Sequence, residues 1–437
     1  MNRITTAKIA TLSVLIVALT FSFVLIGARN VNAEDEVTFY HDNPEWQERW
    51  VELGELSQNE IGIGLDVTEF KTDVYKSRVK TDLTSPRAPE IFKWWFGYRA
   101  QQLVDAGLVA DLSDVWEEVG DKVSPGIREQ LTIDGMTYAV PLHSSYWVWY
   151  YNENLYEKYD MNPPETWQEF MDQAEFFQEK GINFIGNTVG ESRWTSFIVF
   201  QELLLHKDHQ FYKELMAGEA HWTDKEVVET MKQWKTLLDE GYFAPMDSTY
   251  VQDYPRMFKN NELALIPMGT WYSGILMDRG LEPGKDFNVF VLPAISEEGE
   301  GALATEISPL MVGKRAANKE KAKDWLKWWV SDEDARKLDL DLWHPMPWDT
   351  IISEDAVAET NPEFAKLLQE VDNYPNKAIR FWEATPTEIV NHAVAEFERM
   401  LTKPNQWEKV LKSIENQAAK TWPDYDVDYE KQPELEK

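Results

Sequence analysis

The stretch that decides the fold is YAVPLHSSYWVWYYNENLYEKYDMNPPETWQEF, residues 138–170. Its second half contains a clear helix start. Pro163-Pro164 ends the preceding segment, and Thr166-Trp167-Gln168-Glu169 has the pattern of a capping box, in which the threonine bonds forward and the glutamate reaches back. Apolar residues then recur at helical spacing, at Phe170, Ala174 and Phe177. The pattern predicts an amphipathic helix that begins next to Thr166.

Upstream of this stretch, β-prone runs alternate with helix-like segments. The runs are Val37–Tyr40, Leu65–Phe70 and Pro89–Phe92, and the intervening helical segments are Glu45–Leu56 and Tyr75–Leu83. Such alternation is typical of parallel α/β units, in which ligands gather at the carboxyl ends of the strands. With 437 residues, the chain is long enough for two domains of this kind.

Downstream, two more helices are indicated by their apolar faces. Ala322, Trp325, Leu326 and Trp329 form one face, so these two tryptophans are expected in the core. The other helix follows a second capping box, Thr385-Pro386-Thr387-Glu388, with proline at the first helical position. Its apolar face is Ile389, Val390, Ala393, Val394 and Phe397. The tail from Pro423 onward is acidic and polar, and residues 426–437 are expected to fray.

The N-terminus has the pattern of a secretory signal peptide. Arg3 and Lys8 precede an apolar stretch, Ile9–Gly27, and Val31-Asn32-Ala33 supplies small residues for cleavage near Ala33. We therefore expect residues 1–33 to be removed and the protein to reach the periplasm. The stretch is long for a signal peptide, so an uncleaved membrane anchor is the alternative. The chain has no cysteine, which leaves no residue for lipid attachment at the cleavage point.

Composition excludes several function classes. The absence of cysteine excludes disulfides, thiolate metal sites and cysteine nucleophiles. The net charge is −33, and it becomes −36 without residues 1–33, which hold three basic and no acidic residues. A protein with this large a negative charge repels nucleic acid and disfavours strongly anionic ligands.

A second short stretch, PMGTWYSG at residues 267–274, places a tryptophan in a turn after an apolar run. Trp271 is either a lid on the core or a platform for a ligand. Gly269 and Thr270 carry little or no side chain, so a ligand could approach the backbone there. We expect the indole of Trp271 to stack on a ligand ring.

Residues 138–170 together with PMGTWYSG resemble a known family, the extracellular solute-binding proteins of carbohydrate ABC transporters, of the maltose-binding-protein type. The resemblance is carried by a strand that ends in proline, the pair Tyr151-Asn152, the Pro-Pro-x-Thr-Trp-x-Glu-Phe motif and the Gly-x-Trp turn. Ser308-Pro309-Leu310 resembles the family's return crossing, and Phe381-Trp382 resembles its late aromatic site. The resemblance covers nearly the whole chain after residue 33.

The resemblance implies a two-lobed α/β periplasmic-binding-protein fold of type II, with discontinuous domains and a ligand cleft between them. We expect residues 34–142 and 303–345 in lobe I and residues 143–302 and 346–425 in lobe II. It also implies a monomer that closes on a neutral mono- or oligosaccharide and then docks on a membrane permease. The hinges are expected near Pro141–Trp147 and Glu306–Pro309.

A sugar has a C–H face and polar edges, so its site needs flat aromatic rings with carboxylates and guanidinium groups around them. The candidates for ligand contact are Trp271, Trp94, Trp95, Tyr146, Trp147, Asp42, Trp194, Glu306, Trp343, Trp382 and Arg380. Strand alternation predicts that one of Trp94 and Trp95 faces the cleft and the other the core. Asp42 and Glu306 would accept from hydroxyls, and Arg380 or Arg256 would donate.

Other chemistries find less support. His206 and His209 are better explained as a surface pair at a helix end than as metal ligands, and no metal or cofactor is expected. Gly280–Lys285 lacks the spacing of a phosphate loop, and no Gly-x-Ser-x-Gly elbow is present. The alternative function is a secreted enzyme acting on glycans, which would need a catalytic carboxylate pair.

Overall fold

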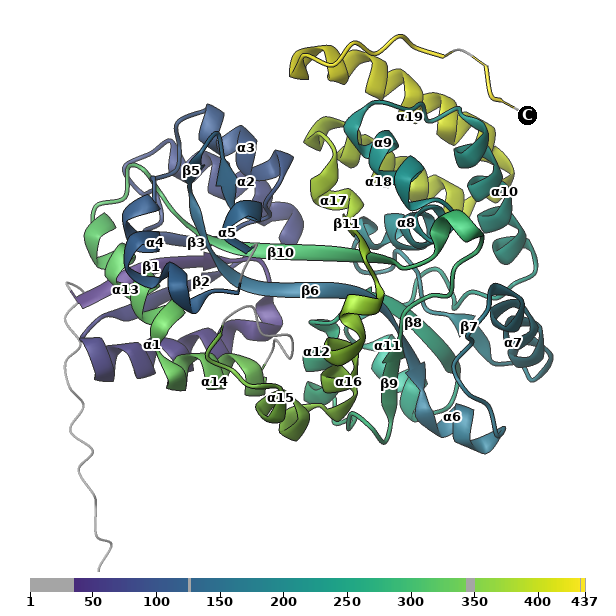
Figure 1. Cartoon of the computed structure of the whole chain (residues 1–437), viewed down its shortest axis with the longest axis horizontal. Helices are drawn as coiled ribbons and strands as arrows, with labels where there is room; N and C mark the ends of the chain where they lie inside the picture. The colour runs from purple at the N-terminus through teal and green to yellow at the C-terminus, as the bar shows by residue number, and fades with distance from the viewer. Residues whose placement is uncertain (1–34, 125–126, 343–349, 433, 437) are drawn as a thin grey trace, which may run out of the picture.

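The computed structural model describes residues 35–124, 127–342, 350–432 and 434–436. The expected signal segment, residues 1–33, and the candidate Trp343 lie outside the described residues. Figure 1 shows two lobes of comparable size side by side, joined by two long strands, β6 and β10. This arrangement agrees with the α/β architecture expected from the sequence.

Most strands belong to one continuous sheet whose order is β2-β1-β3-β10-β6-β8-β7, with β11 paired to β10 and β9 paired to β6. β4 and β5 form a separate two-stranded ribbon. The strand bounds are β1 (Glu36–His41), β2 (Gly64–Glu69), β3 (Ile91–Lys93), β4 (Thr132–Ile133), β5 (Met136–Thr137), β6 (Ala139–Asn152), β7 (Asn183–Ile185), β8 (Leu263–Gly269), β9 (Phe287–Phe290), β10 (Ala302–Val312) and β11 (Asn376–Ile379).

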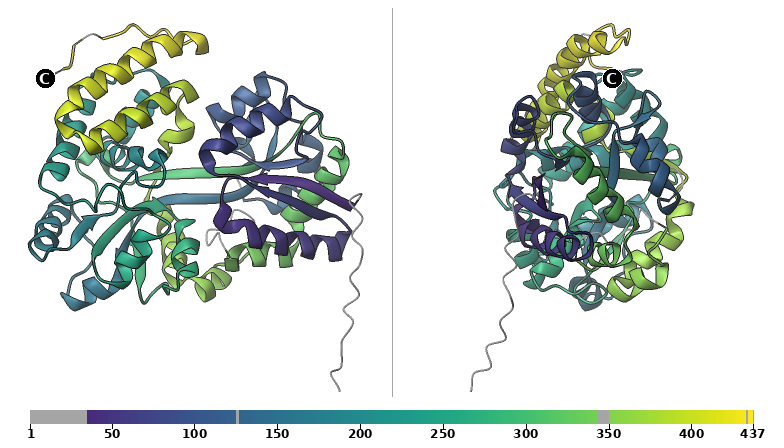
Figure 2. Two further views of the ribbon diagram at one scale, coloured as in Figure 1. Left: turned by 180° about the vertical axis from the view of Figure 1, so that it is seen from behind. Right: turned by 90° about the vertical axis from the view of Figure 1, so that its left-hand side faces the viewer.

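β6 and β10 belong to both lobes. They pair antiparallel from Thr305↔Tyr146 to Met311↔Ala139. At its lobe I end, β10 also pairs on its other side with β3, through Leu310–Val312. Beyond the ladder with β10, β6 continues from Trp147 along β8 and β9 in lobe II. The same two strands therefore carry the chain across between the lobes, as Figure 1 and the left view of Figure 2 show.

The first lobe consists of β1, β2 and β3 with helices on both faces. β1 pairs in parallel with β2 and with β3, so the carboxyl ends of the three strands point the same way. This parallel arrangement confirms the interpretation of the early strand–helix alternation. The helices of this lobe are α1 (Gln47–Ile61), α2 (Thr72–Leu83), α3 (Tyr98–Asp105), α4 (Ser113–Val119), α5 (Ile127–Gln130), α13 (Lys319–Ser331) and α14 (Glu333–Leu342).

The second lobe surrounds β7, β8 and β9 and also contains the C-terminal helices, which Figure 1 shows in yellow over α9 and α10. Its helices are α6 (Glu153–Lys158), α7 (Trp167–Glu179), α8 (Ile198–Leu205), α9 (His209–Ala217), α10 (Lys225–Asp239), α11 (Asp253–Lys259), α12 (Tyr272–Asp278), α15 (Glu354–Thr360), α16 (Pro362–Glu370), α17 (Phe381–Ala384), α18 (Thr387–Thr402) and α19 (Trp407–Thr421). None of the described helices is long and apolar enough to cross a membrane.

The two predicted capping boxes differ in the structure. Thr166 caps α7 as expected, because its hydroxyl accepts from the Glu169 N–H at 3.2 Å. The Glu169 carboxylate reaches back to the N–H of Glu165 at 2.8 Å. At the start of α18 no side-chain cap forms. There Glu388 instead accepts hydrogen bonds from Gln102 and Tyr425, so tertiary contacts replace the local box.

The apolar faces predicted from spacing are buried. Trp325 and Trp329 of α13 are fully covered and stacked with their rings 5.8 Å apart, which confirms their place in the core. The C-terminal tail makes a few contacts with the second lobe where the structure describes it, although most of its residues are exposed. Tyr429 is buried and donates to Glu415 of α19 at 2.6 Å, and the Glu436 N–H donates to the carbonyl of Thr223. Hydropathy alone gave no sign of these polar contacts.

Candidate ligand-binding site

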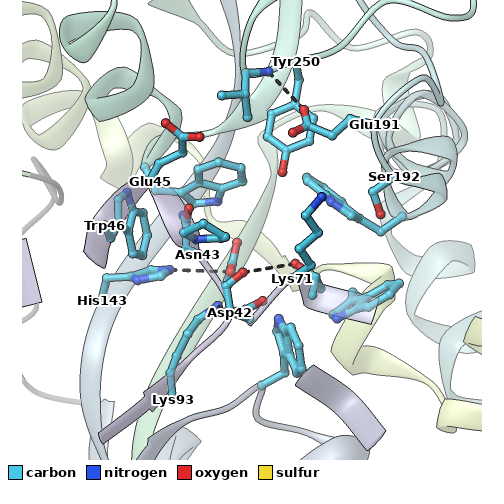
Figure 3. Close-up of a pocket in the computed structure, with 18 of the residues that line it drawn as sticks. Asp42, Asn43, Glu45, Trp46, Lys71, Lys93, His143, Glu191, Ser192 and Tyr250 are labelled. Atoms are coloured by element: carbon cyan, nitrogen blue, oxygen red, sulfur yellow. Dashed lines mark hydrogen bonds and ion pairs between the residues drawn. The ribbon is translucent and has the colours of Figure 1, made fainter. Parts of the chain in front are cut away.

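A cavity of about 440 Å³ lies between the two lobes, against the crossing strands. This volume is in the usual range for small-molecule sites. Residues from both lobes and from β6 and β10 line it: Asp42, Asn43, Pro44, Glu45, Trp46, Lys71, Thr72, Val74, Lys93, Trp95, His143, Glu191, Ser192, Trp194, Tyr250, Val251, Trp271, Glu306, Arg380 and Trp382. In Figure 3, Asp42, Lys93 and His143 lie on one side of the cavity, and Glu191 and Tyr250 lie on the other.

The lobe I side of the cavity is built at the carboxyl ends of β1 and β3. Asp42 follows β1, Lys93 ends β3, and their side chains form a buried ion pair with an Nζ–Oδ1 distance of 2.6 Å. The ammonium group of Lys93 also lies 5.1 Å from the ring centroid of Trp95. Because β1 and β3 are adjacent and parallel, residues 51 positions apart in the chain meet at one edge of the sheet.

A second ion-pair network occupies the base of the cavity. The guanidinium of Arg380 contacts Glu306 of β10 at 2.8 Å and is held on its other side by Glu383. All three side chains are at least 95% covered. Burial opposes the charge on Glu306, but Arg380, together with His143 and Lys93, lowers the pKa of Glu306 to about 2. Glu306 is therefore a permanently charged hydrogen-bond acceptor facing the cavity.

Aromatic rings form the lobe II wall. Trp271 is 9% exposed and lies between the end of β8 and the first residue of α12. Its ring centroid is 6.1 Å from that of Trp194, which in turn contacts Tyr250 edge-on at 5.6 Å. A Cβ on Gly269 would collide with the pyrrole edge of Trp271. Gly269 thus makes room for the indole itself, and the approach of a ligand to the backbone there stays a prediction.

A further pair of aromatic rings at the cavity, Trp95 and Trp382, combines one residue from each lobe. Trp95 of lobe I meets Trp382 of α17 edge-on, with ring centroids 6.2 Å apart. The guanidinium of Arg99 lies 4.0 Å from the Trp382 ring and donates to the Trp382 carbonyl at 3.2 Å. These contacts fix the orientation of Trp382 at the edge of the cavity.

The structure brings most of the predicted candidates together around this one cavity. The candidates that line it are Trp271, Trp95, Asp42, Trp194, Glu306, Trp382 and Arg380. Trp94, Tyr146 and Trp147 do not line it, and Trp343 lies outside the described residues.

The reasons for the three departures are geometric. Trp94 points into the lobe I core and donates to the Arg99 carbonyl, so of the adjacent pair only Trp95 faces the cavity. Tyr146 alternates with the cavity-lining His143 along β6 and is directed to the opposite face. Trp147 shares the face of His143 but is buried against Phe197.

Two further expectations are corrected. Arg256 is exposed, forms ion pairs with Asp253 and Glu262, and does not line the cavity. His206 is buried rather than on the surface, and its Nε2 lies 3.6 Å from Glu202 one turn earlier in α8. Residue spacing shows where a helix ends but not which neighbouring element covers that end.

Sequence reasoning missed several cavity residues, namely Trp46, Lys71, Lys93, His143, Glu191 and Tyr250. Trp46 follows the turn at residues 41–44, which the sequence did indicate, and it meets His143 edge-on. Lys93 ends a predicted strand, so its position at a carboxyl edge was a usable signal. Glu191 and Tyr250 lie in loops whose path no local pattern predicts.

A second cavity, of about 460 Å³, lies on the other face of β10. Thr305 and Ile307 line it, whereas the intervening Glu306 lines the first cavity, as strand alternation requires. Among the residues lining the second cavity there is no tryptophan and no cation. The first cavity is therefore the better candidate for a ligand with both a flat face and polar edges.

Comparison with known proteins shows which proteins this chain resembles. An uncharacterised ABC transporter extracellular-binding protein of Pyrococcus horikoshii is 26% identical over 304 residues, which cover 66% of each chain. A probable sugar-binding periplasmic protein of Rhizobium meliloti is 27% identical over 218 residues, 48% of this chain and 51% of the relative. The alignments thus span 66% or less of the length of these relatives.

Among solved structures, a chitin oligosaccharide binding protein matches with a TM-score of 0.77 at 20% identity, covering 88% of this chain and 99% of the other. This likeness confirms the predicted two-lobed solute-binding-protein fold. A sequence profile of the family described as bacterial extracellular solute-binding proteins matches residues 47–336. With the cavity between two α/β lobes and a match over more than half of its length, the chain belongs to the bacterial extracellular solute-binding proteins.

Proposed function

We propose that this protein captures a neutral mono- or oligosaccharide in the cavity between its lobes and delivers it to the permease of an ABC transporter. The observation that carries the proposal is the convergence of aromatic rings from both lobes on two buried ion pairs, Asp42–Lys93 and Glu306–Arg380. The rings suit the C–H faces of a sugar, and the ion pairs suit its hydroxyls.

The charges of the cavity favour an uncharged ligand. The two buried cations, Lys93 and Arg380, are each already paired with carboxylates of the protein. Lys71 is exposed, lines the cavity and interacts with Glu191. An anionic sugar would therefore meet more carboxylates than unpaired cations, which disfavours its binding.

We infer that the protein binds its ligand without reaction. A glycan-cleaving enzyme needs a protonated carboxylic acid of raised pKa beside a second carboxylate. Arg380 and its neighbours lower the pKa of Glu306 to about 2, so Glu306 does not suit proton donation. Burial raises the pKa of Glu191, another lining carboxylate, and the nearby cations Lys71 and Arg279 oppose that rise. The function of the relatives as binding proteins points the same way.

The lobe boundaries remain a proposal: residues 34–142 and 303–345 in lobe I, and residues 143–302 and 346–425 in lobe II. Pro141 and Pro309 lie opposite each other where β6 and β10 cross, next to a shift in register. Proline has no N–H to donate, so the ladder is weakest at this point. This local weakness supports a hinge in the segments predicted from the sequence.

We further propose that residues 1–33 are a signal peptide cleaved near Ala33 and that the mature protein is a periplasmic monomer. Intact-mass analysis of the exported protein tests the cleavage. Retention of residues 1–33 in a membrane fraction would instead show an anchored protein.

A thermal-shift screen tests the function. The panel contains neutral mono- and disaccharides, longer neutral oligosaccharides and the uronic-acid counterparts of the monosaccharides. A ligand present at 100 times its Kd adds about 2.7 kcal/mol to the unfolding free energy, so a true ligand raises the melting temperature by several degrees. Stabilisation by uronic acids alone would contradict a neutral ligand.

A further inference from the structure

Two ion pairs span the mouth of the cleft. Glu45 and Arg49 come from lobe I, in the turn before α1 and in its first turn, and Asp278 and Arg279 come from lobe II, at the end of α12. Arg49 pairs with Asp278, and Arg279 pairs with Glu45 at 2.8 Å. Each lobe therefore contributes one acid and one base, and each acid faces the base of the other lobe.

These side chains are placed at the cavity rather than on a remote surface. Glu45 lines the cavity, and Arg279 donates from its Nε to the carbonyl of Val251, another lining residue. The side chains of both pairs are only 13–34% exposed, so solvent screens them less than it screens a free surface pair. Both pairs join segments more than 200 positions apart in the chain.

We propose that Glu45, Arg49, Asp278 and Arg279 form a rim clasp that holds the two lobes closed and so sets the affinity of the protein for its ligand. The inference rests on the proposed two-lobe division and hinge. A hinge rotation that opens the cleft must separate the four side chains, because they lie on opposite lobes at its mouth. They act as positioning residues, since the energy of their pairing is present only in the closed form.

The crossed arrangement of signs also specifies how the lobes meet. A slip along the rim would bring Glu45 toward Asp278, or Arg49 toward Arg279, and like charges repel. Other charges near the clasp are Glu52, beside Arg49, and Glu191, which faces both Glu45 and Arg279. The two basic side chains thus counter an excess of acidic groups, and removing either would leave net repulsion between the lobes.

The test exchanges the two charges within one lobe. In E45R/R49E, lobe I keeps its net charge, but each exchanged side chain now faces a like charge across the mouth. D278R/R279D does the same from lobe II. Combining all four substitutions restores opposite charges across the mouth. No variant alters the net charge of −33.

The readout is the distance between spin labels on Glu55→Cys in α1 and Lys285→Cys beyond α12, measured by pulsed electron paramagnetic resonance. The parent chain has no cysteine, so the two introduced thiols are the only ones that the spin label can modify. Both sites are exposed. We expect a mainly short distance between the labels for the parent protein at low salt. At 1 M salt we expect a longer distance, because the Debye length is then about 3 Å and salt weakens the ion pairs.

Either single-lobe exchange should lower the ratio of closed to open molecules about tenfold, since both pairs change from attraction to repulsion. The four-residue exchange should restore the short distance. Unchanged distances in both single-lobe exchanges, with the fold intact by circular dichroism, would overturn the clasp. No ligand is needed, so a failure of the clasp is distinguishable from a failure of the proposed sugar binding.

Discussion

Trp271 is held at the cavity by Gly269, whose missing side chain leaves the space that the indole fills. Only 9% of this side chain is exposed, so a sugar that covers the rest of the ring adds about 0.5 kcal/mol of apolar burial, which Trp271→Ala removes. Sugar affinity should then fall by about two- to threefold. Calorimetry with the best sugar of the screen measures this change.

Trp167 provides the matched control for Trp271. It is partly buried, stacks on Phe170 with ring centroids 4.9 Å apart and does not line the cavity. Trp167→Ala should therefore lower the unfolding free energy and leave sugar affinity unchanged. If Trp271→Ala behaves in this way too, Trp271 is a packing residue and its assignment to the site fails.

A single residue, His41, should also make the unfolding free energy depend on pH. Burial lowers its pKa from 6.5 to about 4, although the hydrogen bond with Gln47 opposes the shift. Between pH 6.5 and 4 the unfolded chain therefore binds the proton and the folded chain does not, so stability falls as the pH falls. The loss attributable to His41 should reach about 3 kcal/mol near pH 4.

Urea unfolding of the parent protein and of His41→Asn, measured between pH 4 and pH 7, checks this prediction. The difference in unfolding free energy between the two proteins should shrink as the pH falls, because asparagine does not titrate. A constant difference across this range would show that His41 is not the group responsible.

At the scale of single elements, α7 and α18 form a natural comparison. Thr166 caps α7, whereas the Thr387 hydroxyl at the start of α18 is buried with no hydrogen-bond partner among the described residues. Thr166→Val should cost about 1 kcal/mol of unfolding free energy. Thr387→Val, which keeps the shape and removes an unsatisfied hydroxyl, should be neutral or stabilising. Equal losses in the two variants would show that the Thr166 cap contributes nothing.

The elements themselves were largely predictable, because strand alternation, apolar spacing and capping residues act over short distances. The early strands, α1, α2, α7, α13 and the apolar face of α18 all follow from such local patterns. The failed cap of α18 shows the limit. Glu388 has partners in α3 and in the C-terminal segment, and no local pattern reveals them.

The site was predictable only in part for the same reason. Candidates beside a strand end or in the Gly-x-Trp turn, such as Asp42, Trp95 and Trp271, do reach the cavity. Trp94, which follows β3, and Trp147, in β6, are the same residue type, but packing against α3 and Phe197 takes them into the core. Composition cannot distinguish an aromatic ring that covers a core from one that faces a ligand.

At the scale of the whole molecule, we propose that the two lobes move about β6 and β10. A ligand in the cavity would contact both lobes, so its binding should stabilise the closed form. Small-angle scattering at high salt, where the rim clasp is screened, should show a smaller radius of gyration when sugar saturates the protein. An unchanged radius at saturation would indicate a rigid, preformed site.

The most direct test of the whole account is calorimetric titration of the parent protein with the best neutral sugar and with its uronic-acid counterpart, followed by mass spectrometry of the sugar after long incubation. The account predicts one-to-one binding of the neutral sugar, at least tenfold weaker binding of the uronic acid and recovery of the sugar unchanged. Preferential binding of the acid, or recovery of a cleaved sugar, would contradict it.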